Sequence, residues 1–250
     1  MYNDLVSVII PVHNAERFID DTVASIKSQT FSNWEVIMVN DSSTDNSRSI
    51  MESYTTDPRF RVIDLSGKGG AANARNAGLA AAKGRFIAYL DADDIWFPDK
   101  LEAQLAFMEK HECAFSFTAY EYATADGIGV AKIVQVPSTI TYREAIKNTT
   151  IFTSTVMFDR QKLDEKLMVM PDVPSEDSAT WWQVLRSGIK GYGMRDPKTL
   201  YRRSAGTLSA NKFTAIKRVW NLYRNVEHFN VFYSAYCFCF YAFNAVVRRM

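Results

Sequence analysis

Residues 86–94, Phe-Ile-Ala-Tyr-Leu-Asp-Ala-Asp-Asp, are an apolar run that ends in three carboxylates within four positions. The apolar part is too short for a buried helix and lacks helical spacing, so it predicts a central strand of a parallel sheet, apolar on both faces. Asp91, Asp93 and Asp94 would then follow the carboxyl end of that strand. Ligands of open α/β sheets bind in the crevice outside the carboxyl ends of the strands, so this junction is the predicted functional site.

Three carboxylates crowded at one strand end repel one another unless a cation lies between them. Oxygen-only ligands suit Mg²⁺ or Mn²⁺, so the cluster indicates a divalent cation. The alternative is that these are solvated loop aspartates, or helix caps ahead of Pro98. The three acids alone do not decide between the two interpretations.

Strands and helices alternate through the first part of the chain. Apolar, β-rich runs predict strands at 6–10, where Pro11 stops the run, at 34–39, at 60–63 and at 86–90. Helices are predicted at 18–27, from Ser47 onward, and from the Lys68-Gly69-Gly70 turn to Ala82. This alternation is typical of right-handed βαβ units and a parallel sheet.

The pattern changes after the acidic cluster, and the second half is predicted to be mixed rather than doubly wound. We expect a helix from Pro98 to His111, strands at 113–122 and 131–136 around an Asp126-Gly127 turn, and a capping box at 141–144. A strand at 151–158, a helix at 175–186 and a short strand at 199–202 follow. From Phe213 onward the chain is predicted to be helical.

The composition is that of a globular protein with balanced charge. Of 250 residues, 47% are hydrophobic, and 29 Lys and Arg face 28 Asp and Glu, so no global charge favours nucleic acid as a partner. Cys113, Cys237 and Cys239 form neither a metal-ligand spacing nor a disulfide framework, which fits a reducing compartment. Because the first strand follows Met1 almost at once, no signal peptide is expected.

Two positions at strand ends could face a nucleotide base. Pro11 makes a rigid turn after the first strand, where backbone groups could lie against a flat base, although proline after a strand is common. Asp41 ends the second strand and should lie beside Pro11, where its carboxylate could accept the N3 proton of a uracil. Equally, Asp41 could cap the following helix.

The glycine-rich segment 69–78 matches neither a dinucleotide-binding nor a P-loop pattern. It does carry Arg75 on an otherwise Ala-rich helix. An arginine that faces a sheet is costly to bury unpaired, so Arg75 either extends to solvent or reaches an acidic partner or the nucleotide.

Glu176 and Asp177 lie in the first turn of a predicted helix capped by Ser175. Complementarity to the helix dipole, worth about 0.3–1 kcal/mol, is sufficient to explain two acids there. The same dipole would keep Asp177 ionised, as a general base must be before it takes a proton.

Five segments in order resemble the inverting GT-A glycosyltransferases of family 2 that act in bacterial surface polysaccharide biosynthesis. They are Ser-Val-Ile-Ile-Pro-Val-His-Asn (7–14), Val-Asn-Asp-Ser-Ser-Thr-Asp (39–45), Gly-Gly-Ala-Ala-Asn-Ala-Arg-Asn-Ala-Gly (69–78), Leu-Asp-Ala-Asp-Asp-Ile-Trp (90–96) and Ser-Glu-Asp-x-x-x-Trp (175–181). The resemblance covers roughly residues 5–210. It implies a Rossmann-like α/β/α sandwich with a mixed sheet, followed by a C-terminal helical tail.

The resemblance also implies roles for individual residues. Asp177 would be the catalytic base, and Asp93, with Asp91, would hold Mn²⁺ or Mg²⁺ on the diphosphate. The expected ligands of the UDP-sugar are Pro11, Val12, Asn14, Glu16, Asp41, Arg75, Asp91, Ala92 and Asp93. Two positions depart from the family pattern: Ser204 stands where many relatives have a histidine, which puts a histidine metal contact in doubt, and His13 stands where relatives often have tyrosine.

We expect a nucleotide-sugar-binding half at 1–110, an acceptor-binding half at 111–211 and an aromatic-rich tail at 212–250. Residues 229–247 carry no charge and could by length just span a bilayer. Polar interruptions, aromatics in the middle and basic flanks favour an interfacial helix instead. The alternative is a helix packed on the domain or on another subunit.

The predicted function is transfer of a sugar from a UDP-sugar to a hydroxyl of a lipid-linked saccharide, on the cytoplasmic side of the membrane and peripheral to it. One alternative, a sugar-1-phosphate nucleotidyltransferase, would need a Gly-rich basic loop after the first strand, where this chain has Pro-Val-His-Asn. The other is a sugar-nucleotide-binding module without catalysis, which the presence of both Asp93 and Asp177 disfavours.

Overall fold

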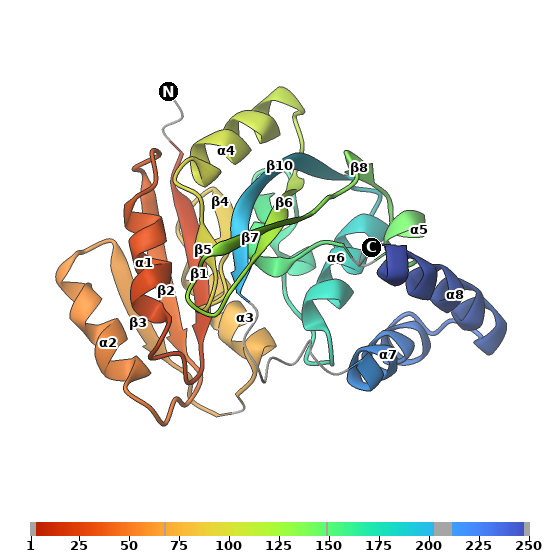
Figure 1. Cartoon of the computed structure of the whole chain (residues 1–250), viewed down its shortest axis with the longest axis horizontal. Coiled ribbons are helices and arrows are strands. Elements are labelled where there is room, and N and C mark those ends of the chain that lie inside the picture. The colour runs from red at the N-terminus through yellow and green to blue at the C-terminus, as the bar shows by residue number, and fades with distance from the viewer. Residues whose placement is uncertain (1–3, 68, 149, 203–211, 248–250) are drawn as a thin grey trace.

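The computed structural model describes residues 4–67, 69–148, 150–202 and 212–247. A mixed sheet runs through the molecule with helices on both of its faces (Figure 1). Its strands are β1 Val6–Val12, β2 Trp34–Asn40, β3 Phe60–Asp64, β4 Phe86–Tyr89, β5 Ile95–Trp96, β6 Phe115–Ala123, β7 Gly129–Val134, β8 Thr139–Ile140, β9 Met157–Asp159 and β10 Gly191–Arg202. The α-helices are α1 Ile19–Lys27, α2 Ser47–Ser53, α3 Ala71–Ala81, α4 Lys100–Lys110, α5 Tyr142–Ala145, α6 Glu176–Arg186, α7 Lys212–Asn221 and α8 Val231–Val247.

The order of the strands determines which ends meet. The main path is β3-β2-β1-β4-β9-β6-β10-β5, and β1 to β4 are mutually parallel, as the sequence predicts. Strand β9 is antiparallel to both β4 and β6, and β10 is parallel to β6. The strands β1, β2, β4, β6 and β10 therefore point the same way, and their carboxyl ends share one edge of the sheet.

Two hydrophobic layers sandwich the sheet, because successive strand residues alternate between its faces. Val8 and Ile10 of β1 pack with α1, α2 and α4 on one face. Ile9 packs with α3 and α6 on the other. The α/β/α sandwich with a mixed sheet that the sequence predicts is confirmed.

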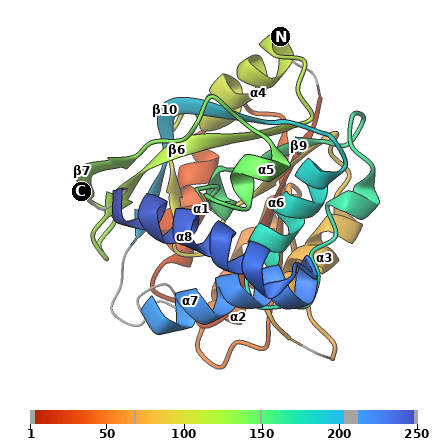
Figure 2. The same ribbon diagram turned by 90° about the vertical axis from the view of Figure 1, so that its right-hand side faces the viewer.

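The C-terminal segment packs against the domain beside α5 and α6, as Figure 2 shows. Trp182 of α6 stacks on Tyr223 at a centroid distance of 5.5 Å, and the Tyr223 hydroxyl is bonded to the carbonyl of Ile146. The carboxylate of Glu227 accepts hydrogen bonds from Tyr142 and Arg186. The sequence predicts the helices but not the π-helical turn at Leu222–Val226 that separates α7 from α8.

Several predicted element boundaries are wrong. Residues 151–158 are not one strand: Thr153–Thr155 form a 3₁₀ turn, and only Met157–Asp159 pair as β9. The turn is favoured because the Ser154 hydroxyl and carbonyl bond the acidic loop and the Trp96 indole. Strand β1 continues past Pro11, whose missing N–H is tolerated because β4 no longer pairs with β1 at that point.

Two other elements differ in length from the prediction. Strand β10 spans Gly191–Arg202 rather than 199–202, because pairing with β6 overrides the weak strand propensity around Gly193 and Pro197. A side chain at Gly193 would meet the carbonyl oxygen of Pro137 at 2.0 Å, so a glycine is required there. The helix expected from Pro98 begins at Lys100.

Candidate active site

The loop from Asp91 to Asp94 follows β4 and is held in place from two directions. The hydroxyl of Thr22, on α1, donates to the carbonyls of Ala92 and Asp94 at 2.9 and 2.8 Å. The backbone N–H of Asp91 donates to the Ser154 hydroxyl at 3.0 Å. The loop is therefore a rigid element at the carboxyl edge of the sheet, where the sequence places it.

The three carboxylates of this loop have different surroundings. Asp91 accepts a hydrogen bond of 2.6 Å from Nη2 of Arg75. Asp94 is fully buried and accepts from the Ser154 hydroxyl at 2.5 Å and the Arg202 amide at 3.3 Å. Among the residues that the structure describes, Asp93 has no ion-pair partner. Burial and then the charge of Asp91 raise the pKa of Asp93 to about 6.

A divalent cation would therefore stabilise the charged form of Asp93, because its positive charge would offset both the burial and the nearby charge of Asp91 that raise this pKa. The donor set is oxygen only, as Mg²⁺ and Mn²⁺ prefer. The described residues contain no group of three His, Cys, Asp or Glu side chains that could complete a metal site. A cation on Asp93 and Asp91 would take its other ligands from phosphate oxygens and water, which is usual for Mg²⁺.

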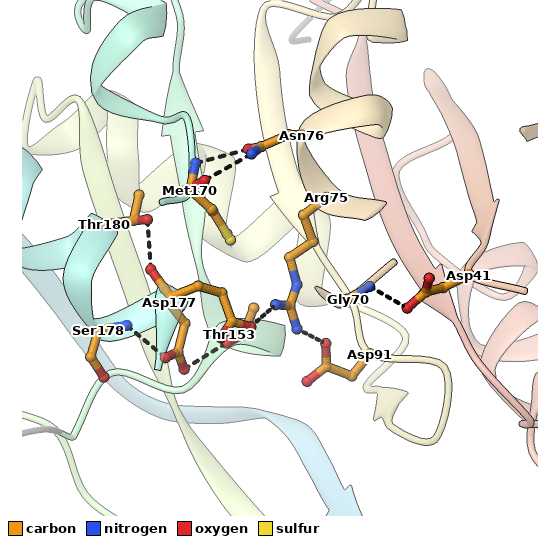
Figure 3. A network of polar contacts seen from close by, with 11 residues as sticks. Asp41, Gly70, Arg75, Asn76, Asp91, Thr153, Met170, Asp177, Ser178 and Thr180 are labelled. Carbon is orange, nitrogen blue, oxygen red and sulfur yellow. Dashed lines mark hydrogen bonds and ion pairs between the residues drawn. The ribbon is translucent and has the colours of Figure 1, made fainter. Parts of the chain in front are cut away.

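Arg75 joins the acidic loop to the start of α6, as Figure 3 shows. Its side chain is 6% exposed, and it donates to Asp91 at 2.6 Å and to Glu176 at 2.7 Å. Burial alone would lower the pKa of the guanidinium, but Asp91 and Glu176 outweigh burial and raise it. The sequence left open whether Arg75 extends to solvent or reaches an acidic partner or the nucleotide, and the acidic partner is confirmed. The Nε atom of Arg75 is buried without a hydrogen-bond partner.

Asp177 lies next to this bridge, at the second position of α6. Its carboxylate accepts a hydrogen bond from the Thr153 hydroxyl at 3.2 Å and from the Ser178 amide at 2.6 Å (Figure 3). No described residue forms an ion pair with it. Trp181 and Trp182, both buried on α6, fix the helix in the core and so fix the position of Asp177.

The prediction that Ser175 caps α6 is wrong. Its backbone is in the left-handed region, with φ 62° and ψ 51°, and its side chain makes no capping hydrogen bond. A capping residue typically has extended backbone, which Ser175 does not have. Asp177 itself accepts the Ser178 amide and satisfies one of the free donors there.

Asp41 accepts a 2.7 Å hydrogen bond from the Gly70 amide, which brings the start of α3 against the end of β2. A side chain at Gly69 would meet Oδ1 of Asp41 at 2.3 Å, so glycine is required for this close approach. Asp41 does not cap α2. The N-cap position of α2 is Asn46, which makes no side-chain capping hydrogen bond, and the preceding Asp45 accepts the Ser47 amide at 2.9 Å.

The other residues expected around the nucleotide gather on the same side of the site. Pro11 and Val12 end β1 beside Val39 and Asn40 of β2. Asn14 and Glu16 hold the loop after β2: Oδ1 of Asn14 accepts the Thr44 amide at 2.8 Å, and Glu16 accepts the Asn46 amide at 2.9 Å. Their roles as nucleotide ligands stay predictions. Exposed His13 is bonded to the carbonyl of Asp41 at 2.6 Å.

Several residues of the site were not predicted from the sequence. Thr22, Thr153, Ser154 and Arg202 come from three separate elements, namely α1, the 3₁₀ turn at Thr153–Thr155 and β10, and none of them lies in one of the five quoted segments. Ser and Thr hydroxyls bond locally in so many contexts that sequence alone gives no signal for these positions. Ser204, the position at which the family resemblance implies a histidine, lies outside the described residues.

A mixed sheet flanked by helices, with acidic residues at its carboxyl edge, is the GT-A glycosyltransferase fold. The family model for glycosyl transferase family 2 matches residues 7–168, and the chain belongs to that family. It is 42% identical over 251 residues, all of this chain and 99% of the relative, to a Bacillus subtilis (strain 168) protein named as the teichuronic acid biosynthesis glycosyltransferase TuaG. The chain is thus a glycosyltransferase, which sets aside both alternatives left open by the sequence.

Another relative and one solved structure agree. The Escherichia coli UDP-Glc:α-D-GlcNAc-diphosphoundecaprenol β-1,3-glucosyltransferase WfgD is 38% identical over 219 residues, which are 87% of this chain and 85% of WfgD. The crystal structure of S. aureus TarS 1–349 in complex with UDP-GlcNAc superposes with a TM-score of 0.69 at 20% identity. The match covers 96% of this chain and 71% of that one, and it supports the fold.

Proposed function

We propose that this chain transfers a sugar from a UDP-sugar to a hydroxyl of a lipid-linked saccharide, with inversion at the anomeric carbon, in the synthesis of a cell-surface polysaccharide. The observation that carries the proposal is one arrangement at the carboxyl edge of the sheet. Asp93 and Asp177 lie on separate rigid elements, which Arg75 joins through Asp91 and Glu176. Neither Asp93 nor Asp177 is engaged in an ion pair with a described residue.

The mechanism assigns a different role to each of these two carboxylates. Asp177 takes the proton of the acceptor hydroxyl, whose oxygen forms a bond to the anomeric carbon while the bond from that carbon to the UDP oxygen breaks. Attack from the face opposite the leaving group inverts the configuration. Asp93 and Asp91 would hold Mn²⁺ or Mg²⁺, which when bound neutralises charge on the diphosphate. The name of a relative supports the donor class, since WfgD is named as a transferase that acts with UDP-Glc.

The nucleotide would bind on the β1 and β2 side of the site. There Asp41 lies beside Pro11 and Val12 at the end of β1, and a uracil could pair with the Asp41 carboxylate. Arg75 is already paired with Asp91 and Glu176. We infer that it does not leave these carboxylates to bind the nucleotide directly, and that it influences nucleotide binding by fixing the position of Asp91. Asn14, Glu16 and Ala92 would shape the loops around the base and the ribose.

We infer further that the tail holds the enzyme on the cytoplasmic surface of the membrane. No helix in the described part of the chain is long and apolar enough to cross a bilayer. Helix α8 packs on the domain through Cys237 and Ser234, while Phe232 and Phe243 are 89% and 67% exposed. The packing interpretation is confirmed for one face, and the exposed aromatic face has the character of an interfacial helix.

The proposal is tested with the purified protein, a panel of UDP-sugars and α-D-GlcNAc-diphosphoundecaprenol in detergent as the acceptor. We expect one or a few UDP-sugars to be consumed and a glycosylated lipid to form only with Mn²⁺ or Mg²⁺. Chelation with EDTA should abolish transfer, and renewed Mn²⁺ should restore it. Transfer that persists at full rate in EDTA would contradict metal dependence, and lack of transfer from every UDP-sugar to this and other lipid-linked saccharides would contradict the function.

A further inference from the structure

Four aromatic side chains form a continuous cluster at the carboxyl ends of β6 and β10. Tyr120 and Tyr122 come from β6, Tyr201 from β10 and Phe152 from the segment before β9. Ring centroids are 4.6 Å apart for Phe152 and Tyr201, 5.0 Å for Tyr120 and Phe152, and 5.7 Å for Tyr122 and Tyr201. All four side chains are half-buried. This aromatic cluster therefore presents ring surface to solvent at the edge of the sheet where the active site lies.

Two residues of the aromatic cluster directly precede residues that bond the carboxylates of the site. Phe152 directly precedes Thr153, whose hydroxyl bonds the carboxylate of Asp177. Tyr201 directly precedes Arg202, whose amide bonds the carboxylate of Asp94. The cluster is thus a neighbour both of the proposed base and of the acidic loop, and a ligand on it would be held within reach of Asp177.

The strand order places the cluster on the far side of the site from the proposed nucleotide. Asp41 and Pro11 end β2 and β1, which lie on one side of β4, while β6 and β10 lie on the other side beyond β9. The acidic loop after β4 stands between them. A donor with its base at Asp41 and its diphosphate at Asp93 would therefore leave the aromatic cluster to the second substrate.

The chemistry of the rings suits a sugar ring. Aromatic faces carry negative potential, and the C–H bonds on the less polar face of a pyranose carry a weak positive charge, so the two stack. Tyrosine adds a polar tip to an apolar body, which fits a ligand with both hydroxyls and C–H faces. A lipid chain has no polar groups to match, and the exposed aromatic face of α8 would suit it better.

We propose that the aromatic cluster of Tyr120, Tyr122, Phe152 and Tyr201 binds the terminal pyranose ring of the acceptor saccharide and presents its hydroxyl to Asp177. This inference rests on the proposed function and names the part of the site that recognises the acceptor. The four rings are specificity and positioning residues, and none of them takes part in proton transfer.

Strand β10 supplies a matched pair of variants for the test. Tyr201→Leu removes a ring of the cluster, while Tyr192→Leu removes a half-buried ring of the same strand at its opposite end, next to His111. With α-D-GlcNAc-diphosphoundecaprenol, Tyr201→Leu should raise the acceptor KM about tenfold, a change of about 1.4 kcal/mol in binding free energy. Tyr201→Phe should stay within about threefold and Tyr192→Leu should not change. The Kd of UDP with Mn²⁺ should be unaltered in all three.

An unchanged acceptor KM in Tyr201→Leu would overturn the proposal. If Tyr201→Leu also loses UDP binding, Phe152→Leu replaces it, with the same expected rise in the acceptor KM. Loss of UDP binding in Phe152→Leu as well would show that the cluster supports only the fold. Saturation-transfer NMR with methyl N-acetyl-α-D-glucosaminide separates this inference from the proposed function. Saturation of its ring protons by the wild type but not by Tyr201→Leu supports the cluster even if no transfer occurs, and no saturation by the wild type contradicts it.

Discussion

Arg75 and Glu176 are 101 positions apart in the chain, yet Nη1 of the arginine lies 2.7 Å from Oε1 of the carboxylate. The same guanidinium holds Asp91 with its other terminal nitrogen. One buried cation therefore connects the loop that would carry the metal to the helix that carries the proposed base. Both halves of the site depend on it for their relative position.

Arg75→Met should destabilise the fold by about 3–5 kcal/mol, because two partly buried carboxylates would lose their shared cation. Transfer should fall even at temperatures where the variant stays folded, since Asp91 and α6 would no longer be joined. Chemical denaturation and transfer rates measure the two effects. Combining Arg75→Met with Glu176→Gln should recover part of the stability and none of the activity.

The matched control is Arg48, whose side chain is 39% exposed and pairs with Glu52 and Asp64. Arg48→Met should change the free energy of unfolding by less than about 1 kcal/mol, because pairs between exposed charges contribute little. A loss as small as this in Arg75→Met would show that the buried bridge does not hold the site together.

The parallel half of the fold could be predicted because its signals are local. Residues 86–90 are apolar on both faces of the strand. Because β4 is buried on both faces, it needs such a run regardless of which elements pack around it. The position of Asp91 to Asp94 follows directly from the end of β4. Asp41 could likewise be placed beside β1 from the strand order alone.

The remainder could not be predicted because it depends on contacts between distant residues. Residues 151–158 have the β-rich composition of a strand, but Ser154 turns away to bond Asp91, Asp94 and Trp96. Arg75 carries the same sequence signal whether it meets solvent, nucleotide or acid, and only the fold shows that Asp91 and Glu176 lie on either side of it. The left-handed backbone of Ser175 could not be predicted either, because the segment Pro-Ser-Glu-Asp has the composition of an ordinary helix cap.

Asp93→Ala should abolish Mn²⁺-dependent binding of UDP and leave the protein folded, because it removes a carboxylate that burial and Asp91 already disfavour. Isothermal titration calorimetry with and without Mn²⁺ measures the loss. Asp94→Ala provides the contrast: it leaves the Ser154 hydroxyl and the Arg202 amide without their acceptor and should cost about 1–3 kcal/mol of stability. Mn²⁺-dependent UDP binding of wild-type strength in folded Asp93→Ala would refute its assignment as metal ligand.

Lys100 should make stability depend on pH. Its amine is fully buried over the Trp96 ring without a hydrogen-bond partner, and burial lowers its pKa well below the usual value. The unfolded chain binds the proton more tightly, so the contribution of this group to stability is complete only above pH about 10.4 and is lost as the pH falls toward the lowered pKa.

Lys100→Met should therefore stabilise the protein by about 1–3 kcal/mol near pH 7, and the gain should shrink as the pH rises toward about 10. Urea denaturation at both pH values measures it. Lys110→Met, at the exposed end of the same helix, should change the free energy of unfolding by less than about 0.5 kcal/mol at either pH. A gain in Lys100→Met that grows with pH would contradict a lowered pKa.

The exposed face of α8 should carry membrane binding without contributing to the core. The double variant Phe232→Ser with Phe243→Ser should lose flotation with liposomes of anionic lipid while its melting temperature stays close to that of the wild type. Ile128→Ser, on the β6–β7 hairpin and also 67% exposed, is the control and should float normally. Flotation of the double variant at the wild-type level would leave α8 as a packing element only.

Asp177 is proposed as the base of a single-displacement transfer, and the variant Asp177→Asn tests this role. Asparagine keeps the shape of the side chain but cannot accept the proton, so transfer should fall by about 10² to 10⁴ while the affinity for the UDP-sugar hardly changes. Asp126→Asn, in the exposed turn between β6 and β7, should transfer at the wild-type rate.

The decisive measurement is the transfer rate of Asp177→Asn under single-turnover conditions, together with the anomeric configuration of the wild-type product by NMR. We expect a variant that binds the donor and transfers almost nothing, and a wild-type product whose anomeric configuration is opposite to that of the donor. A wild-type rate in Asp177→Asn, or a product that keeps the configuration of the donor, would contradict this mechanism.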